Sequence, residues 1–319
     1  MLLLSLFNWA LGLVFGAILA KRIKDHFHEN SISINFPLIC SIAYTSMMVW
    51  HGGLSGSAPL ALATEDHFLF EITGAVPITD TILTPMNLTA SVAVIFCILI
   101  AVRVFLPEKQ AIPKVSDRQK TEPKAQFDFF VVIPGILFLL TIIYIFVISP
   151  DRFRVINLNF MNFLLFGLAL LSSGNLKTFT ENTKKAVSDS TGILIQFPIY
   201  AGIMGLANGS GLAEGFTEFL VSKSSAESFP LITLFSAGVL NFFIPSGGGQ
   251  WAIQGPILVD AARQLGLDFG KAVMAMAYGD QLTNMIQPFW ALPLLGITKV
   301  DPTKLLYYSI RFMIIGALV

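Results

Sequence analysis

The stretch NFFIPSGGGQWAIQGP, residues 241–256, interrupts an apolar segment with a turn rich in glycine, serine and proline. The apolar arm before it begins at FPLI, residues 229–232, and its length of about 15 residues would reach ~22 Å as a helix. The hydrocarbon core of a bilayer is about 30 Å thick, so this arm is too short to cross it. Unpaired backbone is tolerated inside a membrane where it is buried in protein or lines a wet cavity. The stretch therefore predicts a re-entrant helical hairpin over 229–262, in preference to a polar loop outside the membrane.

A second copy of this pattern lies earlier in the chain. FPLI recurs at residues 36–39, and the apolar arm after it leads to another small-residue turn, HGGLSGSAP at 51–59. TDTILT at 79–84 likewise resembles GDQLTN at 279–284. Paired, interrupted segments in corresponding halves of a chain are typical of transporters with inverted repeats. We therefore expect three parts: a first inverted repeat over 1–106 with a hairpin at 36–64, a charged cytoplasmic linker over 107–127, and a second repeat over 128–319.

The composition places the chain in lipid. Of its 319 residues 54% are hydrophobic and 13% are charged, with a mean hydropathy of +0.72, whereas soluble domains carry about 25% charged residues. The 20 basic and 20 acidic residues balance, and no basic tract offers a surface for nucleic acid. The chain has no HExxH, CxxC or GxSxG motif, which argues against an enzyme. The bilayer is the expected partner of most of the surface.

The apolar stretches predict an all-α, polytopic membrane protein. A spanning helix needs about 20 mostly apolar residues. In the first repeat we expect a spanning helix, an interfacial helix, the hairpin, a helix broken near Asp80 and a second spanning helix. Clusters of Lys and Arg after residue 20, in the linker and near 177–185 favour the cytoplasmic side for those loops. The predicted apolar spans are 2–20, 85–106, 129–149, 157–173, 190–208, 303–319 and a broken helix at 272–296.

The two hairpin tips are the candidate substrate site. At the start of each returning arm, unpaired backbone N–H groups carry the positive end of a helix dipole, which suits a carboxylate. The serines and the glutamine add neutral hydrogen bonds, and His51 is interpreted equally well as a proton carrier or as a structural histidine. The candidate substrate-binding residues are His51, Gly52, Gly53, Ser55, Gly56, Ser57, Ser246, Gly247, Gly248, Gly249, Gln250 and Trp251. An apolar pocket around Phe242 and Trp251 would hold a short alkyl tail.

The broken helices supply candidates for ion coupling. Asp80 and Asp280 occupy matching places in the two repeats, and carboxylates inside a membrane are functional candidates by default. Hydroxyl and amide side chains nearby would serve H⁺ or Na⁺ alike, so the coupling ion stays open. No other cofactor or metal site is expected. The candidate residues are Asp80, Thr84, Asn87, Asp280, Thr283, Asn284 and Gln287.

The same segments carry a resemblance to a known family. WHGGLSGS at 50–57, TPMNL at 84–88, NFFIPSGGGQWAIQGP at 241–256 and GDQLTN at 279–284 closely resemble the short-chain fatty acid transporter family, over essentially the whole chain. The resemblance implies uptake of small monocarboxylates, such as acetoacetate or butyrate, across a bacterial inner membrane by a multi-pass carrier. The family is similar to a larger group of ion transporters, which implies elevator-type movement of the hairpins and a homodimer formed through the scaffold.

The repeat also leaves alternatives open. Two helices precede the second repeat's counterpart of 2–20 and none precedes 2–20 itself, so we expect two N-terminal spans to be missing relative to the family. An inactive remnant is therefore one alternative. A related dicarboxylate or amino-acid carrier is another, although its substrates would require an additional buried Arg or acidic partner. An intramembrane enzyme built from His51, Ser55 and Ser57 is the least favoured interpretation.

Overall fold

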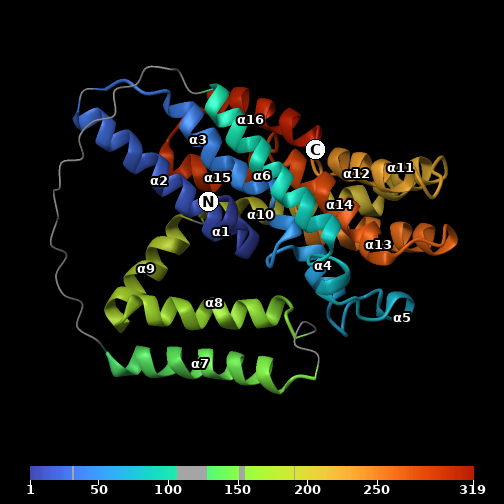
Figure 1. Ribbon diagram of the computed structural model, residues 1–319, viewed down its shortest axis with the longest axis horizontal. Coiled ribbons are helices and arrows are strands. Elements are labelled where there is room, and N and C mark those ends of the chain that lie inside the picture. Colours follow the sequence, from blue (N-terminus) through green and yellow to red (C-terminus); the bar gives the residue numbers. More distant parts are fainter. Residues whose placement is uncertain (31, 106–127, 151–154, 190) are drawn as a thin grey trace.

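The computed structural model describes residues 1–30, 32–105, 128–150, 155–189 and 191–319 (Figure 1). Within these ranges every regular element is an α-helix or a short 3₁₀ turn and none is a strand, which confirms the predicted all-α class. The linker predicted at 107–127 lies outside the described residues. The fold up to residue 105 comprises α1 (Leu2–Phe7), α2 (Trp9–Glu29), α3 (Phe36–Tyr44), η1 (Thr45–Met48), η2 (Trp50–Gly52), α4 (Ser57–Leu62), α5 (Phe70–Thr73), η3 (Ile78–Asp80) and α6 (Pro85–Phe105).

The remainder of the described chain is longer than this first part. Its elements are α7 (Phe129–Ile148), α8 (Leu158–Ser173), α9 (Leu176–Asp189), α10 (Thr191–Gly209), α11 (Leu212–Val221), α12 (Phe229–Leu240), α13 (Gly247–Gln264), α14 (Phe269–Thr283), α15 (Pro288–Thr298) and α16 (Pro302–Ala317).

Both predicted hairpins appear as helix, turn and helix. Proline occupies the first turn of the incoming helix in each, at Pro37 in α3 and Pro230 in α12, where its missing N–H and fixed φ fit a helix start. The first hairpin then passes through two 3₁₀ turns before α4 begins at Ser57. The second passes from the end of α12 through the turn at 241–246 to α13. Ser246 caps α13 by accepting a hydrogen bond from the amide of Gly249.

Two predicted boundaries were wrong. The span at 2–20 is divided at Asn8, where the backbone is extended. The side chain of Asn8 caps a new helix by accepting a hydrogen bond from the amide of Leu11. This helix, α2, continues through the basic cluster to Glu29, where a separate interfacial helix was expected. The helix expected to be broken near Asp80 is not a crossing helix, because residues 67–84 contain only the four-residue α5 and the 3₁₀ turn η3.

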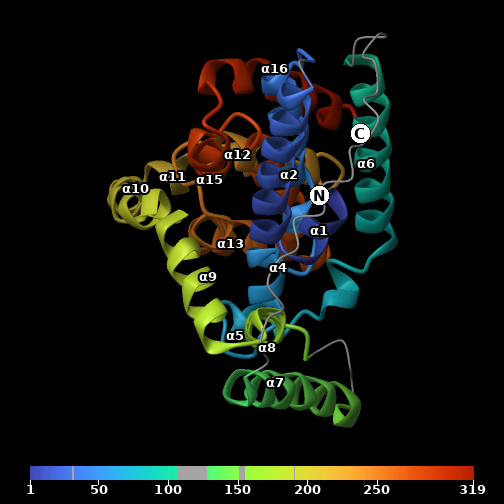
Figure 2. The ribbon, with the colours of Figure 1, turned by 90° about the vertical axis from the view of Figure 1, so that its left-hand side faces the viewer.

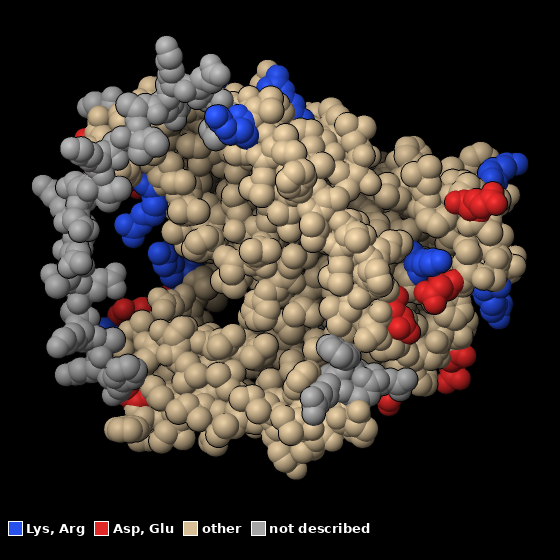
Figure 3. Space-filling view, viewed as in Figure 1, with Lys and Arg blue, Asp and Glu red and all other residues tan. Residues whose placement is uncertain are grey.

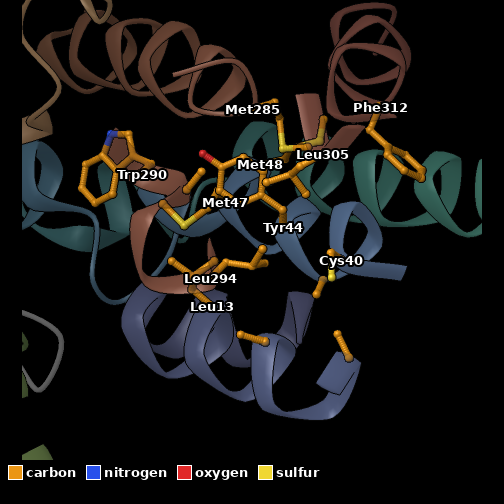
Figure 4. Packing of buried hydrophobic residues seen from close by; sticks show 14 of the residues in the cluster. Leu13, Cys40, Tyr44, Met47, Met48, Met285, Trp290, Leu294, Leu305 and Phe312 are labelled. Carbon is orange, nitrogen blue, oxygen red and sulfur yellow. The ribbon is translucent and has the colours of Figure 1, made fainter. Parts of the chain in front are cut away.

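Two apolar clusters position the first hairpin tip. The larger cluster joins α2, α3, η1, α15 and α16, and Figure 4 shows Met47, Met48 and Tyr44 directed into it. The second joins α4, α12, α13 and α14 around the fully buried Trp251. Since η1 belongs to the first cluster and α4 to the second, the turn between them is held on both sides.

Among the residues that the structure describes, two helices meet the length and composition of a membrane span. They are α6 and α7. In their most apolar stretches, 11% of the residues of α6 and 17% of those of α7 are buried. α7 packs with α8 at one end of the molecule (Figures 1 and 2), and α8 in turn contacts α4 and α9. In Figure 3 the face toward the viewer is largely uncharged, and its charged side chains lie toward the periphery. The remaining crossings of the predicted topology stay a prediction.

Candidate substrate and ion site

The centre of the site is a contact between the first hairpin tip and α14. His51 in η2 and Asp280 in α14 are both fully buried, and Nδ1 of His51 lies 2.6 Å from Oδ2 of Asp280. The second imidazole nitrogen, Nε2, accepts a hydrogen bond from the backbone amide of Ala58 at 3.2 Å. An acceptor at Nε2 places the ring hydrogen of neutral His51 on Nδ1. His51 therefore donates to Asp280, and the tip of the first hairpin is fastened to the second half of the chain.

The tip of the second hairpin meets the same histidine. A Cβ atom added to Gly247, the first residue of α13, would lie 2.4 Å from Cε1 of His51 and 2.7 Å from Oγ of Ser57. No side chain fits there, so glycine is what allows the start of α13 to reach the opposite tip. Oγ of Ser57 is buried and has no hydrogen-bond partner among the described residues. The two predicted tips are thus in contact.

Gln281 holds the backbone of the first tip. Its Oε1 accepts hydrogen bonds from the amides of His51, at 3.1 Å, and Gly52, at 3.3 Å. Gln281 lies within GDQLTN but was not among the predicted site residues. Its position directly after Asp280 was the available signal.

Asn87 and Tyr278 hold the same turn from the other side. Nδ2 of Asn87, at the start of α6, donates to the carbonyls of Gly52 and Ile82, at 2.8 Å and 2.6 Å. The hydroxyl of Tyr278 in α14 donates to Oδ1 of Asn87 at 3.0 Å. Asn87 was a predicted site residue. Tyr278 was missed because nothing in the sequence around it indicates that its hydroxyl donates a hydrogen bond within the site.

A polar network connects the end of α12 to α14. Nδ2 of Asn241 lies within hydrogen-bond distance of the Asp280 carbonyl, Oγ1 of Thr283 and Oδ1 of Asn284, at 3.1, 2.9 and 2.9 Å. Nε2 of Gln250 donates to the carbonyl of Ala237 at 2.8 Å. In these hydrogen bonds the side-chain nitrogens of Asn241 and Gln250 are the donors, which fixes the orientation of both amide groups. Three buried oxygens of the network then have no partner among the described residues: Oδ1 of Asn241, Oε1 of Gln250 and Oδ1 of Asp280.

Several predicted ion residues lie elsewhere. Asp80 is exposed in η3, where its carboxylate accepts a hydrogen bond from Thr79, and it does not join Asp280. Oγ1 of Thr84 donates to the carbonyl of Thr81. Gln287 is buried and caps α15 by accepting from the amide of Phe289.

The remaining predicted substrate residues have structural contacts. Oγ of Ser55 accepts a hydrogen bond from the amide of Trp9 at 2.9 Å, and Gly53 and Gly56 pack closely on backbone carbonyls. Trp251 is 1% exposed within the second apolar cluster, while Phe242 is 43% exposed. The structure therefore does not bring Phe242 and Trp251 together as the walls of a pocket.

Within the ranges that the structure describes, no group of three or more His, Cys, Asp or Glu residues could hold a metal ion. The buried unpartnered oxygens around Asp280 are of the type that hard cations bind.

Comparisons with known proteins agree with the resemblance of the motifs. The chain matches the short chain fatty acid transporter family over residues 1–319. A protein of Escherichia coli K12 called "Putative short-chain fatty acid transporter" is 34% identical over 325 residues, covering 98% of this chain and 73% of that protein. A protein of the same description from Haemophilus influenzae Rd is 33% identical over 334 residues, covering 97% and 73%. No solved structure matches. The chain belongs to the short-chain fatty acid transporter family.

Proposed function

We propose that this protein carries short-chain fatty acids, small monocarboxylates such as acetoacetate or butyrate, across the bacterial inner membrane by secondary active transport. The observation that carries the proposal is the contact of Gly247 with His51 and Ser57, which joins the two hairpin tips beside Asp280.

This contact provides the chemistry for a carboxylate. The first amides of a helix have no acceptor within the helix and carry the positive end of its dipole. In α13 these amides belong to Gly247 and Gly248, next to the unpartnered hydroxyl of Ser57. A carboxylate that reaches this point would accept from the amides and from the hydroxyl.

The site favours a substrate with a single negative charge. Among the residues that the structure describes, no Lys or Arg side chain is buried. A dicarboxylate or an amino acid would bring an additional charge, and burying a charge without a partner costs several kcal/mol. A monocarboxylate avoids this cost.

Asp280 is the proposed point of ion coupling. Its carboxylate is fully buried, its ring partner His51 is neutral in the observed hydrogen-bond arrangement, and its Oδ1 has no partner. A proton on this oxygen, or Na⁺ held by it, would neutralise the charge. Alternating access by an elevator-type movement of the hairpins, in a homodimer, completes the proposal.

Uptake into vesicles tests the function. The purified chain is reconstituted in liposomes, and labelled butyrate, acetoacetate and succinate are supplied under an inward pH gradient or an inward Na⁺ gradient. We expect saturable uptake of the two monocarboxylates and none of succinate, driven by one of the gradients. Folded protein that gives no uptake above protein-free liposomes would contradict the proposal and favour an inactive chain; light scattering of the purified protein tests the dimer separately.

A further inference from the structure

Three cavities follow one another along the side of α6 that faces α12 and α14. The outer cavity, of 350 Å³, is lined by Asp80, Asp268 and Lys271, and the middle one, of 260 Å³, shares Met86 and Lys271 with it. The inner cavity, of 340 Å³, shares Met86 and Tyr278 with the middle one and includes Gln281. The inner and middle cavities lie between α6 on one side and α12 and α14 on the other. We call this row of cavities the lateral crevice.

The walls of the inner and middle cavities are mostly apolar. Met86, Ala90 and Val94 follow one another at intervals of four residues on α6, which places them on one face of the helix. Leu231 and Leu234 of α12 line the opposite wall of both the inner and the middle cavity. A pocket of about 300 Å³ or more with a few polar groups is typical of sites for small organic ligands.

The outer cavity is lined by one cation and two carboxylates. Lys271 is exposed, and its ammonium makes no ion pair within the described residues. The nearby carboxylate of Asp268 is occupied as the cap of α14, where it accepts from the amide of Lys271 at 3.1 Å, and Asp80 is bonded to Thr79. These hydrogen bonds leave both carboxylates negatively charged, so Lys271 does not make the outer cavity net positive, and binding of an anion depends on the inner cavity.

The inner cavity touches the groups that hold the first hairpin tip. Gln281 is 8% exposed and presents its second amide end, Nε2, without an acceptor in the described part of the chain. Its Oε1 accepts from His51 and Gly52. A carboxylate in the inner cavity could therefore accept from Nε2 of the same side chain that fixes the tip.

We propose that the lateral crevice is the loading path of the transported monocarboxylate: the apolar walls of its inner and middle cavities hold the alkyl chain, and Nε2 of Gln281 binds the carboxylate before transfer to the tips. This inference rests on the proposed function and adds to it a place where chain length is recognised. Each buried methylene favours binding by roughly fourfold, so butyrate is expected to bind roughly 15-fold more tightly than acetate.

Filling the inner cavity tests the alkyl site. Ala90→Phe places a ring against the crevice, and Val92→Phe is the matched control because Val92 lies on the same helix and is 66% exposed. We expect Ala90→Phe to raise the KM for butyrate on the order of 10-fold while changing that for acetate little, and Val92→Phe to match the wild type. Equal KM values for both variants, in a chain that transports butyrate normally, would overturn the loading path and leave the proposed function standing.

A labelling experiment gives a readout independent of transport. In a Cys97→Ser background, where the remaining Cys40 is buried, Ala90→Cys and Val92→Cys are treated with N-ethylmaleimide in lipid vesicles. Butyrate is expected to slow labelling at position 90 and not at position 92. Labelling at position 90 that is unaffected by butyrate would overturn the inference. So would a position 90 that is unreactive in vesicles and reactive in detergent, because a lipid chain would then be the occupant.

Discussion

Nδ1 of His51 lies 2.6 Å from Oδ2 of Asp280, and this buried hydrogen bond joins the first hairpin tip to a helix 229 residues later in the chain. His51 is neutral in this arrangement because its Nε2 accepts a hydrogen bond from the amide of Ala58. Any charge of the pair therefore lies on the carboxylate of Asp280. Hydrogen bonds to charged groups contribute about 1.5–3 kcal/mol, roughly twice a neutral one.

Asp280→Asn preserves the shape of the side chain and removes its charge. We expect gradient-driven accumulation of butyrate to fall by about 10- to 100-fold, the equivalent of losing roughly 1.5–3 kcal/mol, because the variant has no carboxylate to take up the coupling cation. Uptake rates in vesicles with and without the ion gradient measure the effect. Asp260→Asn is the control, since Asp260 pairs with Arg263 on an exposed surface where such pairs contribute little. Normal accumulation by Asp280→Asn would exclude Asp280 from coupling.

Gly247→Ala tests the contact of the two tips. The new methyl group would lie 2.4 Å from Cε1 of His51, a separation that forces the start of α13 away from the first tip. We expect butyrate uptake to be abolished. Gly248→Ala is the matched control one residue later, because its Cβ would lie 3.7 Å from Cβ of Ser57, an ordinary contact, and alanine also favours the helix.

The readout for this pair is uptake by protein that elutes as a folded species after purification. If Gly247→Ala is folded and transports as well as Gly248→Ala, the close approach of the tips has no role in transport.

The short helical arms and the turns of small residues at both tips could be predicted because their pattern is local in sequence. Runs of glycine and serine between short apolar arms predicted both hairpins, and matching motifs selected Asp280. The match failed for Asp80, because an offset between two sequences does not show that Ile78–Asp80 would form an exposed 3₁₀ turn. The break at Asn8 was overlooked because average hydropathy does not respond to one capping residue, although an asparagine before an apolar helix is a recognised start signal.

The residues that sequence reasoning missed gain their roles from distant partners. Gln281 meets the amides of a tip 229 residues away, and Tyr278 meets Asn87 across 191 residues. Asn241 is tied to α14 by its side-chain nitrogen. No local pattern contains these distances, so they required the three-dimensional structure.

Tyr278→Phe removes one hydrogen bond and leaves the ring in place. Oδ1 of Asn87 loses its donor, and a single neutral hydrogen bond is worth about 0.5–1.5 kcal/mol. We therefore expect a modest loss of thermal stability in detergent and a decrease in butyrate uptake of roughly 2- to 10-fold. Tyr307→Phe is the control, because Tyr307 is exposed and bonded to Arg311 at the surface. Identical melting curves and uptake for both variants would show that the Asn87 contact is dispensable.

Substitutions of Gln281 separate its two ends. Gln281→Leu removes the acceptor for the amides of His51 and Gly52, and each buried donor left unpaired costs about 1–3 kcal/mol, so we expect a lower melting temperature and little uptake. Gln281→Glu keeps an acceptor for both amides but replaces the Nε2 donor with a negative oxygen. Its melting temperature should remain closer to the wild type while the KM for butyrate rises by about 10-fold or more, because a carboxylate then faces a carboxylate. Gln264→Leu, on an exposed residue bonded to Asp260, should change neither quantity. Retention of the wild-type KM by a stable Gln281→Glu protein would show that Nε2 does not contact the substrate.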